Sequence, residues 1–184
     1  MTQHRTRDLP PDIALRPAVA SDALCLGVLA TQVFLDTYAS EGIRAAIARE
    51  VLASFSTATM HSLIVQGRSR LWVAERVGHL IGFAQMTAGT TQGLVQTARP
   101  AELDRLYVQE PFTRSGVGSA LLRQAERAAA GHRCTALWLT PWVHNVRALT
   151  FYARHAYQNL GITTFLMDGE AIENFVLAKV LSGS

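Results

Sequence analysis

Residues 106–122 combine an apolar segment, a turn with two glycines and the first turns of an amphipathic helix. Gly116 and Gly118 remove side chains at the point where the first backbone N–H groups of such a helix converge. The positive end of the helix dipole adds about half a charge there, and together these groups favour phosphate oxygens. The spacing therefore predicts a site for a ligand that carries phosphate groups.

A second segment, residues 137–157, repeats the order of strand, break and helix. Its helix pattern carries Asn145 near the start and the pair Phe151 and Tyr152 two turns later. Asn145 offers a hydrogen-bond donor and an acceptor to a ligand, and it is equally suited to cap its own helix. An aromatic pair on an amphipathic helix is by itself typical of core packing. Both a ligand contact and plain packing are therefore open for this segment.

Glu102 and Asp104 stand two residues apart in a strand pattern over 102–108, so that their side chains share one face. A carboxylate at that place can act as a general base, directly or through a water molecule. The alternative is that both are solvated charges at a strand end, or partners of Arg105 or Arg114. Position, and not residue type, decides between these interpretations.

Hydrophobic periodicity and turn residues predict strands and helices along most of the chain. Strands are expected at 13–17, 71–75, 80–86, 102–108, 134–140, 158–166 and 172–181, and helices at 21–38, 43–55, 60–65, 116–130 and 145–155. Turns are expected at Gly78-His79 and Asp168-Gly169, Gly131 as a left-handed cap, and Pro141 as the point where the chain turns away. A strand, a helix and a strand between 102 and 140 require a crossover that joins two parallel strands. The prediction is a mixed α/β (α+β) fold, with a central mixed sheet of about six to seven strands and helices on both faces.

With 184 residues, 49% of them hydrophobic and 17% charged, the chain has enough apolar material for one compact domain. We expect residues 1–12 to form a flexible tail and residues 13–184 to form this domain. No apolar run approaches the ~18 to 20 residues of a membrane span, and the polar start does not resemble a secretion signal. A cytoplasmic location without membrane contact is therefore expected.

Charge, cysteine and histidine usage argue against several other classes of function. The net charge is +3, but the arginines are scattered along the chain, so nucleic acid is not an expected partner. Cys25 and Cys134 have neither the spacing of metal ligands nor that of a disulfide framework, which predicts buried reduced thiols. His144 and His155 also lack partners at ligand spacing, so no metal is expected.

Together, the two segments resemble the acetyl-CoA-binding core of the GNAT superfamily of N-acetyltransferases. Residues 113–118 match its pyrophosphate turn, with Thr113 in place of the usual Gln or Arg, and Asn145, Phe151 and Tyr152 match its second signature. The resemblance covers nearly the whole chain and implies the fold of the family and acetyl-CoA as the cosubstrate. The cofactor contacts that it implies lie at Leu106, Tyr107, Val108, Arg114, Ser115, Gly116, Val117, Gly118, Ser119, Asn145 and Tyr152.

The resemblance also implies roles in the chemistry. An alkyl ammonium has a pKa near ~10, so a base must take a proton before the amine can attack a thioester. Glu102 matches the strand carboxylate of some GNAT enzymes, and Asp104 is the second candidate. A backbone N–H near Tyr107 or Val108 would stabilise the negative oxygen, and Tyr152 matches the general acid for the leaving thiolate. Because neither signature holds a cysteine, direct attack in a ternary complex is expected.

A finer resemblance is to the bacterial spermidine/spermine N-acetyltransferases. It is carried by residues 33–38, 106–108, 137–139 and 165–170 and by Trp142. Val143 stands where that group often has Glu. The resemblance implies a primary amine as acceptor, either a polyamine or another small amine, near Asp36, Tyr38 and Trp142. It also implies a homodimer that is built through the closing strands. A charged helix end is ordinarily only solvated, which is the alternative for Asp36.

Two other functions are compatible with part of this pattern. A non-catalytic acyl-CoA-binding sensor or scaffold would keep the fold and the glycine turn, with Tyr152 only structural. A nucleotide at the turn is disfavoured, because no Lys-Ser or Lys-Thr follows Gly118 and the third glycine of a dinucleotide motif is absent. Turnover of acetyl-CoA with an amine separates the enzyme from the sensor.

Overall fold

The computed structural model describes residues 9–181, and every strand and helix expected from the sequence is present in it. Most of the expected tail, residues 1–8, lies outside the described residues, as do residues 182–184. The elements are β1 (Ile13–Pro17), η1 (Ala20–Asp22), α1 (Ala23–Tyr38), α2 (Ala45–Ser54), α3 (Thr57–Val65), β2 (Ser69–Arg76), β3 (His79–Ala88), β4 (Pro100–Val108), η2 (Glu110–Phe112), α4 (Val117–Gly131), β5 (Ala136–Leu139), α5 (Val146–Arg154), β6 (Gln158–Met167) and β7 (Glu170–Val180). None of the helices in residues 9–181 has the length and apolar character that a membrane span requires.

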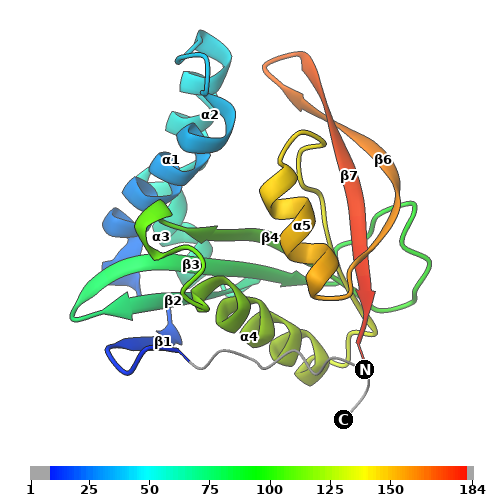
Figure 1. Cartoon of the computed structure of the whole chain (residues 1–184), viewed down its shortest axis with the longest axis horizontal. Coiled ribbons are helices and arrows are strands. Elements are labelled where there is room, and N and C mark those ends of the chain that lie inside the picture. Colours follow the sequence, from blue (N-terminus) through cyan, green and yellow to red (C-terminus); the bar gives the residue numbers. More distant parts are fainter. Residues whose placement is uncertain (1–8, 182–184) are drawn as a thin grey trace.

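The strands form one seven-stranded sheet in the order β1-β2-β3-β4-β5-β7-β6. All neighbours are antiparallel except β4 and β5, which run parallel because α4 crosses between them. Helices α1, α2 and α3 cover one face of the sheet, and α4 and α5 lie on the other (Figure 1). The predicted mixed α/β fold is confirmed.

Two cores lie on the two faces of the sheet. One core contains Leu121 and Leu122 of α4 and Tyr152 of α5. The other contains Leu26 of α1 and Met60 of α3. Burying a leucine or methionine side chain contributes about 1.5 to 3 kcal/mol. Both helical layers are therefore tied to the same sheet, and side chains on either face hold fixed positions.

Glycine is required in α1 because the helix touches the loop that follows α2. A Cβ atom built on Gly27 would lie 2.4 Å from the carbonyl oxygen of Phe55, closer than real contacts allow. This close approach joins α1 to the segment between α2 and α3. The helical layer on that face depends on it.

The parallel strands β4 and β5 separate soon after they begin. They pair only where Pro100–Glu102 faces Ala136–Trp138, and β4 then continues to Val108 without β5 beside it. The backbone groups on this edge of β4 therefore face a gap in the sheet. The gap lies beside α5 and opens toward the glycine turn that starts α4 (Figure 1).

A bulge in β4 changes which side chains face α1 to α3. Leu103 pairs with Met86 and Arg105 pairs with Gln85, so that Asp104 is the extra residue. Leu103 and Leu106 both belong to the core under α4, although they are three residues apart. Asp104 and Arg105 consequently share the opposite face.

Three expectations need correction. Gly131 does not have a positive φ, because α4 continues to this residue and the left-handed position is Arg133, whose φ is 59°. The Arg133 and Cys134 N–H groups donate to Ala130 and Ala129, which closes the helix as a Schellman motif around an arginine. Cys25 is exposed on α1 and not buried, whereas Cys134 is buried as expected.

Pro141 is the third correction, and it concerns half of the prediction: β5 ends at Leu139, before this proline, but the chain does not turn away from β7 there. The Pro141 carbonyl accepts from Phe175 N, and Val143 N donates to the Glu173 carbonyl, so that pairing with β7 continues past β5. Trp142 and Asn174 are opposite one another in this extension.

Candidate active site

The glycine turn presents backbone N–H groups at the start of α4. Arg114 and Gly116 both have left-handed φ values, 62° and 94°, which bend the chain into the helix. The first main-chain bond of α4 runs from Ala120 N to Gly116 O. The N–H groups that precede this bond belong to residues 117–119, and they point out of the end of the helix, as an anion site requires.

Helix α5 is held against this turn at two points. A Cβ atom on Gly118 would lie 3.5 Å from the Phe151 ring, and Ser119 Oγ is 2.9 Å from His155 Nε2. The small residue at position 118 therefore lets α4 and α5 approach each other. Phe151 therefore has the packing role that is typical of an aromatic residue on an amphipathic helix.

Asn145 caps α5 through its carbonyl oxygen, which accepts from Ala148 N at 3.0 Å. Tyr152 is only 6% exposed and lies between the rings of Phe151 and Tyr157. Burial raises its pKa, with a further contribution from Tyr107. The phenol is therefore neutral at physiological pH and able to donate a proton.

Asp104 and Arg105 are joined by a chain of hydrogen bonds across three strands. Arg105 donates to Gln85 Oε1, Gln85 Nε2 donates to Ser69 Oγ at 3.3 Å, and Ser69 Oγ lies 2.7 Å from Thr87 Oγ1. Thr87 Oγ1 donates to Asp104 Oδ2 at 2.8 Å. Since Thr87 gives its proton to Asp104, Ser69 must donate to Thr87, and every donor points toward the carboxylate.

The two β4 carboxylates differ in their surroundings. Burial, and after it the negative charge of Asp104, raises the pKa of Glu102 to about 7, although the positive charge of Arg105 acts in the opposite direction. Burial also raises the pKa of Asp104, but the hydrogen bond from Thr87 and the charge of Arg105 favour its ionised form. The pKa of Glu102 therefore lies near neutral pH, whereas the Asp104 carboxylate accepts a hydrogen bond from Thr87.

Tyr38, Tyr107 and Tyr152 come together from α1, β4 and α5. The pKa of each phenol is raised mainly by burial, and Tyr107 raises the pKa of both other tyrosines electrostatically. Tyr107 packs edge-on against Phe83, with ring centroids 5.4 Å apart. Tyr107 therefore lies within electrostatic reach of both other phenols.

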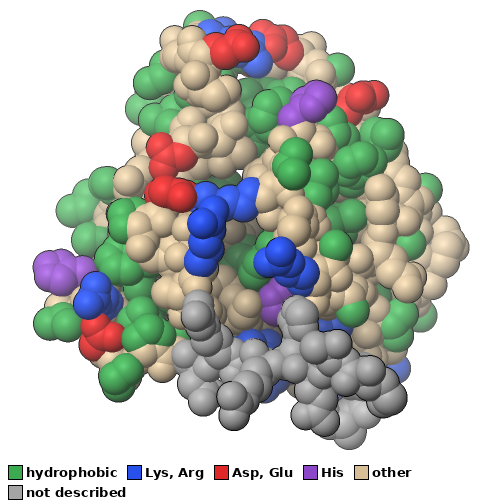
Figure 2. Space-filling view, viewed as in Figure 1, with side chains coloured by type: hydrophobic (Ala, Val, Ile, Leu, Met, Phe, Trp, Pro, Cys, Tyr) green, Lys and Arg blue, Asp and Glu red, His purple; other side chains and the backbone are tan. Residues whose placement is uncertain are grey.

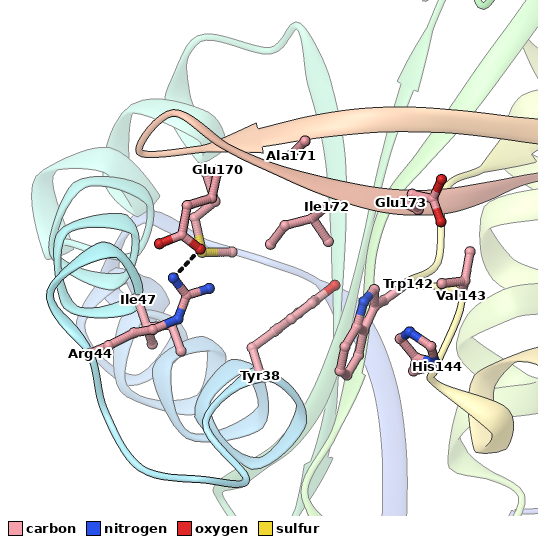
Figure 3. A pocket seen from close by; sticks show the side chains of 11 residues that line it. Tyr38, Arg44, Ile47, Trp142, Val143, His144, Glu170, Ala171, Ile172 and Glu173 are labelled. Atoms are coloured by element: carbon pink, nitrogen blue, oxygen red, sulfur yellow. Dashed lines mark hydrogen bonds and ion pairs between the residues drawn. The ribbon is translucent and has the colours of Figure 1, made fainter.

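A pocket of about 320 Å³ opens on the α1 side of the sheet (Figure 3). Its lining comes from the end of α1, from α2, from the segment before α5 and from the β6–β7 hairpin, and consists of Tyr38, Arg44, Ile47, Trp142, Val143, His144, Met167, Glu170, Ala171, Ile172 and Glu173. The Tyr38 and Trp142 rings lie 5.5 Å apart, and His144 meets Trp142 edge-on. Arg44 and Glu170 form an ion pair at its border. Asp36 is exposed and does not line the pocket, so only Tyr38 and Trp142 of the three expected acceptor residues meet there.

Sequence reasoning missed Asn174, which is 7% exposed on β7. Its Nδ2 donates to the Thr140 carbonyl at 3.1 Å. Its Oδ1 is the one buried side-chain polar atom in residues 9–181 without a hydrogen-bond partner. The available signal was a polar residue at a core position between Ile172 and Val176.

The comparisons with known proteins agree with this geometry. Residues 41–157 match the acetyltransferase (GNAT) family. An uncharacterized N-acetyltransferase of Mycobacterium bovis is 26% identical over 141 residues, 74% of this chain and 86% of that protein. Another from Lactobacillus delbrueckii subsp. lactis is 22% identical over 153 residues, 83% of this chain and 88% of that protein.

Among solved structures, the PaiA N-acetyltransferase of Thermoplasma acidophilum in complex with coenzyme A has the same fold. The TM-score is 0.71 at 22% identity, and the match covers 91% of this chain and 98% of that one. The family match spans well over half of the 184 residues and includes the glycine turn, both β4 carboxylates and α5. This chain belongs to the acetyltransferase (GNAT) family and is an N-acetyltransferase.

Proposed function

We propose that this enzyme transfers an acetyl group from acetyl-CoA to a primary amine by direct attack in a ternary complex. The observation that carries the proposal is the gap between β4 and β5, which has the glycine turn at its open end and Glu102 and Tyr152 beside it. The coenzyme A in the PaiA structure supports the choice of cofactor.

The diphosphate would bind the N–H groups of residues 117–119, beside Arg114 and Ser115. The pantetheine chain would then enter the gap and run along residues 106–108, past Asn145 on α5. The cap on α5 uses only the carbonyl oxygen of Asn145, so that its amide group can still donate.

One N–H group in β4 is oriented for the negative oxygen of the intermediate. Gln109 N donates to Ile81 O of β3, and successive residues of a strand direct their backbone groups to opposite edges. Val108 N–H therefore points into the gap, whereas Tyr107 N–H points to β3. Of the two donors expected from the sequence, Val108 is the better candidate, and such a donor contributes about 3 to 4 kcal/mol in a dry site.

In the reaction, Glu102 takes one proton from the alkyl ammonium, directly or through water, and the neutral nitrogen then attacks the thioester carbon. A second proton leaves the nitrogen for water as the amide forms. The C–S bond then breaks, and the electron pair leaves with the sulfur. Tyr152 gives its proton to this thiolate, so that the products are an N-acetylated amine and coenzyme A. The negative charge of Asp104 raises the pKa of Glu102 toward the working pH.

The acceptor would be a polyamine or another small amine in the pocket. Tyr38 and Trp142 supply aromatic faces, which attract cations, and the Glu173 carboxylate lies at the same pocket (Figure 3). We further propose that residues 13–184 act as one domain and that β6 forms a homodimer contact. Its Ile162, Phe165 and Leu166 side chains are exposed on an edge strand, where such residues favour pairing with another chain.

The test is thiol release from acetyl-CoA with a panel of amines: a diamine, a triamine and an aliphatic monoamine. We expect turnover with at least one amine, and a large loss of kcat in Glu102→Gln and Tyr152→Phe. Glu41→Gln is the matched control, since Glu41 is exposed and outside the site. Coenzyme A binding without turnover across the panel would instead favour a sensor or scaffold, and unchanged rates in both variants would discard the assigned roles.

A further inference from the structure

We propose that Arg147 is a further cofactor-binding residue, and that its ion pair with Glu110 is a latch that opens when the phosphate groups of coenzyme A take the place of the Glu110 carboxylate. This inference rests on the proposed cofactor. It concerns a residue that neither glycine turn nor helix signature includes.

The ion pair joins the two sides of the path that the cofactor would follow. Glu110 belongs to η2, directly before the glycine turn, and Arg147 belongs to the first turn of α5. Farther along, α5 is fixed to α4 through Phe151 and His155. Arg147 therefore reaches across at the open end of α5, where a chain leading from the turn into the gap must pass.

The Glu110 carboxylate occupies a place suited to an anion. Arg147 lowers its pKa most, through a hydrogen bond and through charge, and Arg114 lowers it further. A carboxylate that is paired with one guanidinium group and lies within electrostatic reach of a second resembles a bound phosphate in charge and in acceptor geometry. Arginine binds phosphate through paired N–H groups as readily as it binds carboxylate. Figure 2 shows acidic and basic side chains in contact on this face, to the left of its centre.

The exchange of partners is energetically accessible. The Arg147 and Glu110 side chains are 60% and 64% exposed, and exposed ion pairs contribute little to stability. A diphosphate carries more charge than one carboxylate and would repel Glu110 at short range. Cofactor binding would thus free Glu110 toward solvent and keep Arg147 at the phosphates.

The experiment measures the Kd of coenzyme A by isothermal titration calorimetry for the unaltered protein, Arg147→Gln and Glu110→Gln. We expect Arg147→Gln to raise the Kd by about tenfold, the effect of one lost hydrogen-bonded charge contact. Glu110→Gln is expected to lower the Kd a few-fold, because the competing carboxylate is gone. If the ion pair only stabilised the protein, the Kd of coenzyme A would change in the same direction in both variants, since each variant breaks the pair.

Two further variants sharpen the result. Arg49→Gln breaks another exposed ion pair, with Asp168 on the acceptor side, and should leave the Kd within about twofold. Arg147→Lys should recover part of the affinity, and the Kd of Arg147→Gln should depend less steeply on salt. Equal effects of Arg147→Gln and Glu110→Gln, or none, in a protein that binds coenzyme A would overturn the latch alone. Failure of the unaltered protein to bind coenzyme A would overturn the proposed function as well.

Discussion

The α4–α5 side and the α1–α3 side of the sheet are built in different ways. On the first, one turn and one helix supply the anion site and the aromatic pair, within residues 113–119 and 145–152. On the second, the pocket takes residues from α1, α2, the segment before α5 and the β6–β7 hairpin, which lie far apart in the chain. A short sequence motif can therefore predict the anion site, whereas the residues of the pocket come together only in the folded chain.

The difference extends to the chemistry of the two sides. Backbone N–H groups dominate around the glycine turn, and they depend on conformation more than on side-chain identity. Charged and aromatic side chains dominate on the other face, and their pKa values depend on neighbours from several strands. Changes on the two sides should therefore affect different kinetic constants.

The largest expected effect is the loss of the base. Glu102→Gln should lower kcat/KM for the amine by ~10²- to 10⁴-fold, the usual contribution of a general base. In the unaltered enzyme the rate should rise with pH through about 7, because the carboxylate must be ionised to accept a proton and burial holds its pKa there. The measurement is a pH profile of thiol release, and this limb should disappear in the variant. A profile that keeps the limb near pH 7 would assign it to another group.

The second effect separates the two sides directly. Trp142→Ala should raise KM for the amine by about tenfold and leave the Kd of coenzyme A unchanged, because Trp142 forms an aromatic wall with Tyr38 on the acceptor side. Steady-state kinetics with each substrate varied in turn gives both values. A variant that loses cofactor affinity instead would show that the pocket and the cofactor site are not independent.

The third effect tests how the acceptor side is held in place. Gly27→Ala forces a methyl group against the Phe55 carbonyl and should cost about 1 to 3 kcal/mol of stability. For a chain of this size the melting temperature should fall by roughly 2 to 12 °C. Gly93→Ala is the control, because nothing lies within 4 Å of a Cβ atom there. Equal thermal unfolding curves for the two variants would mean that α1 shifts freely away from the loop after α2.

The sequence predicted the elements well where the signal is local. The glycine turn, the N-cap at Asn145 and the hairpin between β2 and β3 depend on residues that are near one another in the chain. Even the misplaced cap had a local cause. Gly131 suits a left-handed position, but it is still the last residue of α4, and the left-handed residue that follows the C-cap is Arg133.

The acceptor side could not be predicted in the same way, because it depends on the register between strands. The order Leu103-Asp104-Arg105-Leu106 breaks the alternation of polar and apolar residues at the bulge. This pattern alone does not indicate which neighbouring strand pairs with β4 around the bulge. Thr87 becomes the partner of Asp104 only once β3 and β4 are aligned. Asn174 meets Trp142 only because pairing continues past Pro141.

The smallest expected effect concerns the charges around the base. Asp104→Asn removes a negative charge that raises the pKa of Glu102, so that the rising limb of the pH profile should move to lower pH. Asn keeps a carbonyl oxygen for the bond from Thr87, which separates the loss of charge from the loss of contact. Arg105→Gln should move the limb the other way, because Arg105 lowers the pKa of Glu102. The two variants are compared in the same assay, at saturating amine. Shifts in the same direction would mean that rearrangement of the hydrogen-bonded chain, and not charge, sets the pKa of the base.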